Sequence, residues 1–181
     1  MRSLSDPIAI ATADPAWPAL FAAERTRLLA ALSPPLLELE HVGSTAVPGL
    51  DAKPVIDMMA SVATLAAVKR GALRRLGYEP FPTDMKGRLL FIRPPGAATL
   101  RFHLHIVEAA TWDSRKERQF RDHLRRSPTD AAAYGAMKRR LALIHPDDRV
   151  AYTIAKTDVI QQITDRARAA QGLPPEDVWE V

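Results

Sequence analysis

Apolar residues recur at helical spacing near the start of the chain and at a spacing of two residues further on. The segment DPAWPALFAAERTRLLAAL predicts a helix with Asp14 as its cap and Pro15 in its first turn. Its apolar positions lie near one face: Leu20, Phe21, Leu28 and Leu32. The SPP sequence at 33–35 ends this helix.

Strand patterns follow the first helix. LLELEHV at 36–42 alternates apolar and acidic residues, and KPVIDMMASV at 53–62 predicts a buried strand. RLLFIRP at 88–94 and LRFHLHIVE at 100–108 predict two more strands, joined by a PPGAAT loop of hairpin type. Between these pairs, TLAAVKRGALRRLGY predicts a short amphipathic helix that closes at Gly77.

Only helices are predicted after Thr111. The first is WDSRKERQFRDHLRR, the second is capped by Ser127 with Pro128 in its first turn, and the third runs from Asp147 to Ala170. This order of elements predicts an α+β fold (an α/β mixed sheet): a mixed sheet flanked by helices, with a C-terminal helical layer.

Length and composition are those of one globular domain. The chain has 181 residues, of which 47% are hydrophobic and 25% are charged, and this length can bury a sizeable core. We expect one domain over residues 1–181. Its sheet-containing core would span about 7–110, its helical part about 111–170 and its tail 171–181.

Charge and cysteine usage narrow the classes of partner. The net charge of +4 suits an anionic small molecule, whereas the scatter of basic residues over several helices argues against nucleic acid. The absence of cysteine excludes disulfides, thiolate nucleophiles and cysteine-bound zinc. No signal peptide and no membrane-spanning run is recognisable, so we expect a cytoplasmic protein. The pattern does not indicate an oligomeric state.

The first candidate site is the turn in HVGSTAVPGLDAKPVIDMM. Gly43 permits a backbone conformation that other residues resist, and Ser44 and Thr45 offer hydroxyl and amide donors. A helical turn here would direct free N–H groups at an anion. The alternative is that Ser44 only caps a short helix.

Asp57 stands in the middle of an apolar strand, where an unpaired carboxylate is costly to bury. It needs a metal ion, hydrogen-bond donors or an ion pair with a neighbouring arginine or lysine. Two-metal phosphoryl chemistry uses two or three carboxylates, and Met59 occupies the natural position for the second. A conventional two-metal site is therefore not expected.

Two histidines offer a replacement for that carboxylate. Arg101, His103 and His105 share one face of a predicted strand, where residues two apart lie about 6–7 Å from each other. The imidazoles could share a metal ion, donate to a phosphate, or serve only as structural residues.

The helices add basic side chains. Two pairs lie one helical turn apart and share a face: Tyr134 with Lys138, and Tyr152 with Lys156. These lysines could be solvated, and Arg121, next to Asp122, could form a structural ion pair instead of contacting a ligand.

Several blocks together resemble the GrpB family, also called UPF0157. They are HVGSTAVPGLDAKPVIDMM, RLLFIRP, FHLHIVE, FRDHLRRSP, YGAMKRRLA and YTIAKTDVI, in order from about residue 7 to 165. The resemblance implies the nucleotidyltransferase-like fold of the polymerase-beta superfamily. It implies that Gly43 and Ser44 bind phosphate and that Asp57 is the first metal carboxylate, and Met59 departs from the superfamily pattern.

From the residues and the resemblance we expect a divergent nucleotidyltransferase-like protein that binds a nucleotide or another phosphorylated ligand. Catalytic and metal-binding roles fall to Asp57, His103 and His105, with Mg²⁺ or Mn²⁺ as the metal ion. The expected phosphate-binding residues are Gly43, Ser44, Thr45, Lys53, Arg121, Lys138 and Lys156. The alternatives are an inactive nucleotide or phospho-metabolite binding module, and a hydrolase with one metal ion held by the two histidines and the aspartate.

Overall fold

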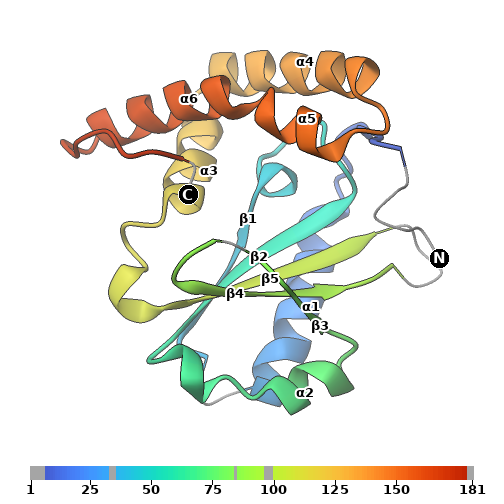
Figure 1. The fold of residues 1–181 in the computed structure, drawn as a ribbon, viewed down its shortest axis with the longest axis vertical. Helices are drawn as coiled ribbons and strands as arrows, with labels where there is room; N and C mark the ends of the chain where they lie inside the picture. The colour runs from blue at the N-terminus through green and yellow to red at the C-terminus, as the bar shows by residue number, and fades with distance from the viewer. Residues whose placement is uncertain (1–6, 33–35, 84, 96–99, 179–181) are drawn as a thin grey trace.

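A five-stranded mixed sheet forms the centre of the fold (Figure 1). The structure is a computed structural model that describes residues 7–32, 36–83, 85–95 and 100–178. The strands are β1 (Glu38–Val42), β2 (Val55–Val62), β3 (Glu79–Phe81), β4 (Arg88–Arg93) and β5 (Arg101–Glu108). Their order is β1-β2-β5-β4-β3, and β2 and β5 pair in parallel while the other pairs are antiparallel. The short strand β3 was not predicted, and residues 96–99 of the predicted hairpin loop lie outside the described ranges.

Helices cover the two faces of the sheet unequally (Figure 1). Helix α1 and the short α2 lie on one side, and α3 to α6 form the predicted C-terminal layer on the other. The α-helices are α1 (Trp17–Leu32), α2 (Arg70–Arg75), α3 (Lys116–Arg126), α4 (Pro128–Ile144), α5 (Arg149–Ile154) and α6 (Thr157–Ala169). The α+β class is therefore confirmed. None of the described helices is both long enough and apolar enough to cross a membrane.

Two predicted helices are interrupted. The third C-terminal helix is not continuous, because it breaks into α5 and α6 with Lys156 as the residue before α6. The segment after β2 forms a single 3-10 turn at Leu65–Ala67 before α2. Period alone could not locate these breaks, since both halves of each segment keep helical spacing.

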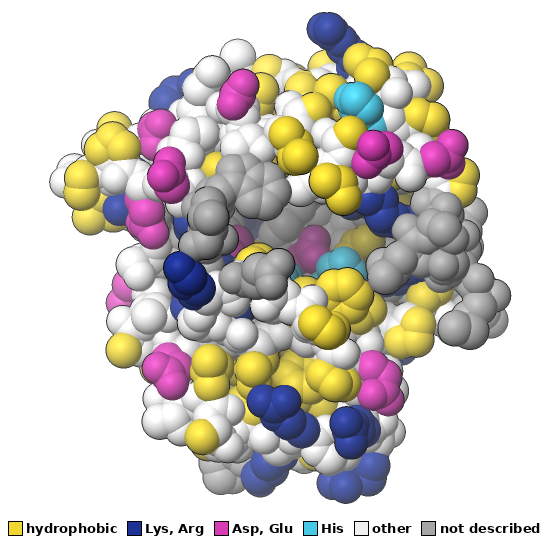
Figure 2. Space-filling view, viewed as in Figure 1, with side chains coloured by type: hydrophobic (Ala, Val, Ile, Leu, Met, Phe, Trp, Pro, Cys, Tyr) yellow, Lys and Arg dark blue, Asp and Glu magenta, His cyan; other side chains and the backbone are white. Residues whose placement is uncertain are grey.

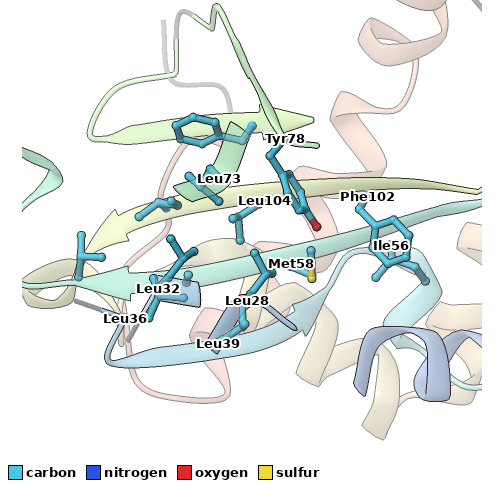
Figure 3. Close-up of a cluster of buried hydrophobic side chains, with 14 of the residues drawn as sticks. Leu28, Leu32, Leu36, Leu39, Ile56, Met58, Leu73, Tyr78, Phe102 and Leu104 are labelled. Atoms are coloured by element: carbon cyan, nitrogen blue, oxygen red, sulfur yellow. The ribbon is translucent and has the colours of Figure 1, made fainter. Parts of the chain in front are cut away.

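The main core lies between α1, α2 and the sheet (Figure 3). Side chains from both strands of the parallel pair meet α1 there, and Leu28, Ile56 and Leu104 are each 0% exposed. Burying a side chain of this size contributes about 1.5–3 kcal/mol. Because side chains alternate along a strand, the neighbours of these core residues must face the C-terminal helical layer.

The second face of the sheet therefore carries the polar candidates. Asp57 pairs in register with His103, and Met59 pairs with His105, so all four side chains leave the sheet on the same side. Met59 is 0% exposed and packs in an apolar cluster that includes Trp112. The space between this face and the helical layer is where the candidate site forms.

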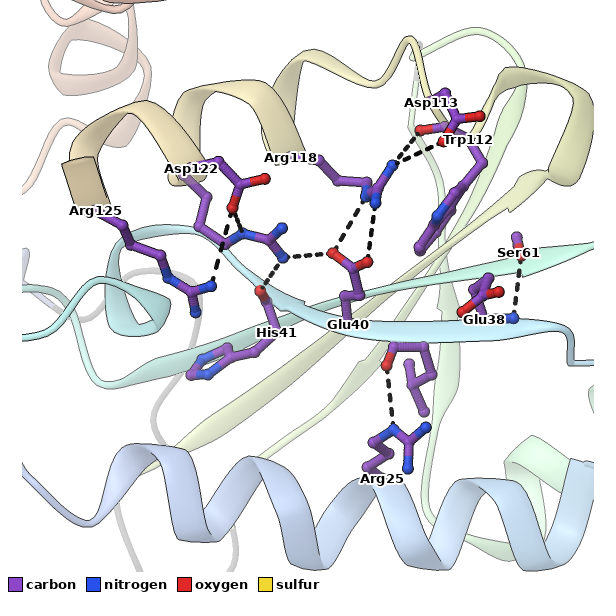
Figure 4. Close-up of polar contacts among 12 residues, drawn as sticks. Arg25, Glu38, Glu40, His41, Ser61, Trp112, Asp113, Arg118, Asp122 and Arg125 are labelled. Atoms are coloured by element: carbon purple, nitrogen blue, oxygen red, sulfur yellow. Dashed lines mark hydrogen bonds and ion pairs between the residues drawn. The ribbon is translucent and has the colours of Figure 1, made fainter. Parts of the chain in front are cut away.

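Helix α3 is held onto β1 by arginines (Figure 4). Arg121 donates to Glu40 Oε2 at 2.6 Å and to the carbonyl of His41 at 2.8 Å. Arg118 donates to both oxygens of the same carboxylate, at 3.0 and 3.2 Å. Bidentate pairs of this kind fix orientation as well as adding energy, and they set the position of the layer that α3 begins.

Candidate functional site

Gly43 brings the turn after β1 directly against Asp57. Its φ of 71° is in the left-handed region, which favours glycine. A Cβ atom at this position would lie 2.5 Å from Asp57 Oδ2. Two separate constraints therefore require glycine here, and the following residues form one 3-10 turn, Ser44–Ala46.

Thr45 uses its hydroxyl inside the protein. The hydroxyl donates to the carbonyl of Val55 at 2.8 Å and lies 2.9 Å from His41 Nε2. Burial lowers the pKa of His41 to about 4, so the imidazole is neutral and its Nε2–H donates to Thr45. The Thr45 hydroxyl therefore orients the turn, while the residue itself still lines the neighbouring cavity.

A cavity of about 220 Å³ opens beside this turn. We call it the lysine cavity, because three lysines line it: Lys53, Lys138 and Lys156. Its other polar lining residues are Ser44, Asp57, Tyr134 and Tyr152, together with Gly43 and Thr45. Figure 2 shows a hollow between the sheet and the helical layer, with basic, acidic and histidine side chains gathered around it.

Lys138 enters the lysine cavity from α4. Its side chain is 3% exposed, its Nζ donates to the carbonyl of Asp51 at 2.6 Å, and it lies 4.7 Å from the centre of the Tyr134 ring. Burial, together with the charges of Lys156 and Lys53, lowers the pKa of Lys138 to about 7. Among the described residues this buried ammonium contacts one carbonyl and one aromatic face, without a carboxylate bonded to it.

Lys156 and Lys53 complete the basic lining. Lys156 Nζ lies 4.5 Å from the centre of the Tyr152 ring, and burial together with the charge of Lys53 lowers its pKa to about 8. Lys53 Nζ lies 5.4 Å from the same ring, and burial lowers its pKa as well. These ammonium groups repel one another in a partly desolvated space, so an anion placed among them would relieve the repulsion.

Asp57 forms the acidic side of the cavity. Its Oδ1 lies 3.1 Å from His103 Nδ1. Burial raises the pKa of Asp57, but the hydrogen bond from His103 and the charges of His103, His105 and Lys53 outweigh it and hold the pKa below its ordinary value. The partner of this carboxylate is therefore a histidine from the neighbouring strand, where an arginine or lysine was one alternative.

His105 lies apart from that pair. Burial lowers its pKa to about 4, and its side chain lines a different, adjoining cavity. Asp57 lines both cavities, so it shares the second one with His105, whereas His103 is among the lining residues of neither.

A pair of bridged metal ions does not fit this site. The position expected for the second carboxylate belongs to Met59, which is fully buried among apolar side chains. Among the described residues, no three histidine, aspartate or glutamate side chains are grouped so that they could hold a metal ion. The carboxylate of Asp57 fits a single divalent cation only if the ligand supplies further oxygens.

Arg121 is the expected phosphate ligand that the structure places elsewhere. It binds Glu40, the carbonyl of His41 and Asp122 on the far side of the turn and does not line the lysine cavity. Tyr134 and Tyr152 do line it, although they were not expected as site residues. The sequence feature that could have identified these tyrosines is their spacing of four residues from a lysine, which places each ring against that lysine.

The fold and the site together define an α+β protein with a lysine-lined cavity between its sheet and its helical layer. The chain belongs to the GrpB family: the family profile described as GrpB protein matches residues 7–166. A UPF0157 protein of Pseudomonas aeruginosa is 41% identical over 174 residues, which cover 93% of this chain and 71% of that protein.

One solved structure agrees with this membership. The crystal structure of the conserved protein GrpB from Enterococcus faecalis matches with a TM-score of 0.78 and 32% identity, over 91% of this chain and 99% of that chain. A structure of Cid1 in complex with its short product ApU matches with a TM-score of 0.44 and 18% identity, over 74% of this chain and 39% of that one. The second likeness is too low to support an argument about activity.

Proposed function

We propose that this protein binds a phosphorylated small molecule, a nucleotide or another phospho-metabolite, in the lysine cavity. The observation that carries the proposal is the meeting of Lys53, Lys138 and Lys156 beside the Gly43–Ser44 turn. Phosphate groups combine high negative charge with several acceptor oxygens, and lysine and small-residue turns are their usual protein partners.

The charge balance indicates how acidic the ligand must be. Three lysines line the cavity with one carboxylate, Asp57, and that carboxylate is already paired with His103. The cavity therefore carries an excess of positive charge whenever its lysines are protonated. A ligand with at least two negative charges would offset this excess, which favours a di- or triphosphate over a monocarboxylate.

Catalysis of nucleotidyl or phosphoryl transfer to an acceptor is the further step of this proposal. The pair formed by Asp57 and His103 supports it, because Asp57 lines the cavity and its carboxylate could accept a proton from an acceptor bound beside the phosphates. The lysines would stabilise charge on the departing phosphate. A single Mg²⁺ or Mn²⁺ bound by Asp57 and phosphate oxygens would supply additional charge neutralisation.

Calorimetry with inorganic tripolyphosphate and ATP tests the binding proposal. We expect both to bind, and we expect Lys156→Met to weaken both by about tenfold or more, since it removes one charged hydrogen bond of about 1.5–3 kcal/mol. Lys69→Met removes an exposed lysine before α2 and is the matched control. The proposal fails if the unmodified protein binds neither anion.

The same titrations separate an enzyme from a binding module. Binding that strengthens with Mg²⁺ or Mn²⁺ and weakens in Asp57→Asn supports the single-cation site. Turnover of ATP with a panel of hydroxyl and amine acceptors, lost in Asp57→Asn, supports transfer. Binding that is indifferent to divalent cations, with no turnover, selects the inactive binding module.

A further inference from the structure

A second cavity, of about 330 Å³, adjoins the lysine cavity. The two share four lining residues: Gly43, Ser44, Asp57 and Tyr134. We call the second one the apolar cavity, because its own walls are largely hydrophobic: Val42, Met85, Phe120, Ile160 and Val178. A molecule whose charged end lay among the lysines could therefore extend past Asp57 into a space of different chemistry.

Besides Arg88, three of the side chains lining the apolar cavity each carry a buried polar atom that has no hydrogen-bond partner in the described part of the chain. These atoms are His105 Nδ1, Glu117 Oε2 and Thr164 Oγ1. Thr164 is only 1% exposed. Nearly all buried polar atoms in proteins are paired, so three unpaired ones around a single cavity indicate that something bound there completes them.

Glu117 determines which chemistry fits. Its Oε1 accepts a hydrogen bond from Arg88, which leaves Oε2 as the unpaired oxygen. Burial raises the pKa of Glu117, but the charge of Arg88, a backbone hydrogen bond at Glu117 and the hydrogen bond from Arg88 together outweigh it and hold the pKa below its ordinary value. An ionised carboxylate oxygen can only accept. The ligand must therefore bring an N–H or O–H donor to this point and cannot bring an anionic group.

The remaining walls of the cavity indicate which kind of group bears this hydrogen-bond donor. Phe120 from α3 and Ile160 from α6 present apolar surface, which suits a flat ring or an alkyl group. The Thr164 hydroxyl can donate or accept, and one imidazole nitrogen of His105 adds a further polar position. Two cationic side chains also line the cavity, but Arg88 is paired with Glu117 and Lys116 donates to the carbonyl of Asp177. The combination of apolar walls with a few convergent polar atoms therefore suits a neutral heterocycle.

Resting on the proposed function, we propose that the apolar cavity binds the amino-bearing base of the same nucleotide whose phosphates occupy the lysine cavity. The exocyclic amino group donates to Glu117 Oε2, and the neighbouring ring nitrogen pairs with the Thr164 hydroxyl. Adenine and cytosine offer this donor beside an acceptor. Hypoxanthine and uracil offer a carbonyl oxygen instead, which the carboxylate repels.

Paired nucleotides test this assignment by calorimetry. ATP should bind about tenfold more tightly than ITP, and CTP than UTP, since one hydrogen bond to a charged group separates each pair. Glu117→Gln keeps the shape but offers an amide that can donate or accept, so the preference should disappear. Glu38→Gln, at an exposed position of β1, is the matched control and should keep it.

Thr164→Val is a second variant that leaves the pair of Arg88 and Glu117 intact. This substitution should weaken the binding of ATP and leave the affinity for inorganic tripolyphosphate unchanged, because tripolyphosphate has no base. Equal affinity for ATP and ITP, with neither variant having an effect while tripolyphosphate still binds, would overturn this proposal and leave the proposed function standing.

Failure of tripolyphosphate to bind would instead overturn the proposed function. The base site can then be tested by itself with adenosine and inosine, which carry no phosphate, in ligand-observed NMR experiments. Contacts seen with adenosine and not with inosine, and lost in Thr164→Val, would support the assignment. Equal signals from the two nucleosides would refute it.

Discussion

Replacing Lys138 with methionine should stabilise the ligand-free protein, although it removes a residue of the proposed site. The side chain is 3% exposed, and burial lowers its pKa from 10.5 to about 7. A buried lysine with a depressed pKa lowers the stability of the folded state at every pH below its pKa in the unfolded chain. On folding, the side chain must either lose its proton or keep its charge in a desolvated site. Methionine has a similar length and no charge to desolvate.

The size of the effect follows from the pKa shift. At 1.36 kcal/mol per unit, a shift from 10.5 to about 7 corresponds to roughly 5 kcal/mol of destabilisation below pH 7. The variant also loses the hydrogen bond from Lys138 to the carbonyl of Asp51, which offsets about 1–2 kcal/mol. Lys138→Met should therefore be more stable by about 3 kcal/mol at pH 6.

The sign of the pH dependence is fixed by the direction of the shift. Between pH 7 and pH 10.5 the unfolded chain binds the proton more tightly, so the wild-type protein gains stability as the pH rises. The advantage of Lys138→Met should shrink over this range, vanish near pH 9 and become a disadvantage of about 1 kcal/mol by pH 10, where only the loss of the hydrogen bond to Asp51 remains. Urea denaturation of both proteins and of the Lys69→Met control, at pH 6, 8 and 10, measures it. A variant that is less stable than wild type at pH 6, or a difference that does not vary with pH, would refute the reasoning.

Three other perturbations report on the same site. Gly43→Ala should destabilise the protein by about 2 kcal/mol or more in thermal unfolding, because φ is 71° and the new Cβ would lie 2.5 Å from Asp57 Oδ2; normal stability would show that the turn can move. Sulfate, whose own charge is constant from pH 6 to 9, should bind at least tenfold more weakly at pH 9, since the pKa values of Lys138 and Lys156 are about 7 and 8; a flat calorimetric profile would exclude these lysines. Arg121→Met should lower stability by about 2 kcal/mol, because it removes hydrogen bonds to Glu40, yet leave tripolyphosphate affinity unchanged; a large loss of affinity would return this residue to the cavity.

Local pattern was sufficient to predict which side chains share a face within one strand. Alternation put Asp57 with Met59 and His103 with His105, and the structure then sets Asp57 opposite His103. Their 3.1 Å contact depends on the parallel pairing of β2 with β5, which is a long-range contact that no spacing within either strand encodes. The resemblance to GrpB implied the fold and a pocket shared by Asp57 and the histidines, but it did not specify this strand pairing.

The helical side of the site was harder to predict for the same reason. The spacing of Tyr134 and Lys138 shows that they share a face, but the face that docks on the sheet is decided by α3 and its anchoring to Glu40. That carboxylate is also why Arg121 lies outside the lysine cavity, where the sequence had suggested a phosphate ligand. A basic residue on a helix looks the same in sequence whether its partner is a ligand or a glutamate on a distant strand.

The lysine cavity lies at an interface between two parts of the chain, because its two walls come from separate halves of the sequence. The turn after β1 and the start of β2 form one wall, while α4 and the junction of α5 with α6 supply the other (Figure 1). A bound ligand would contact both walls, so it would have to dissociate before the helices could separate from the sheet. The rate of amide hydrogen exchange in α4 and α6 should therefore fall as the fraction of protein with ligand in the lysine cavity rises.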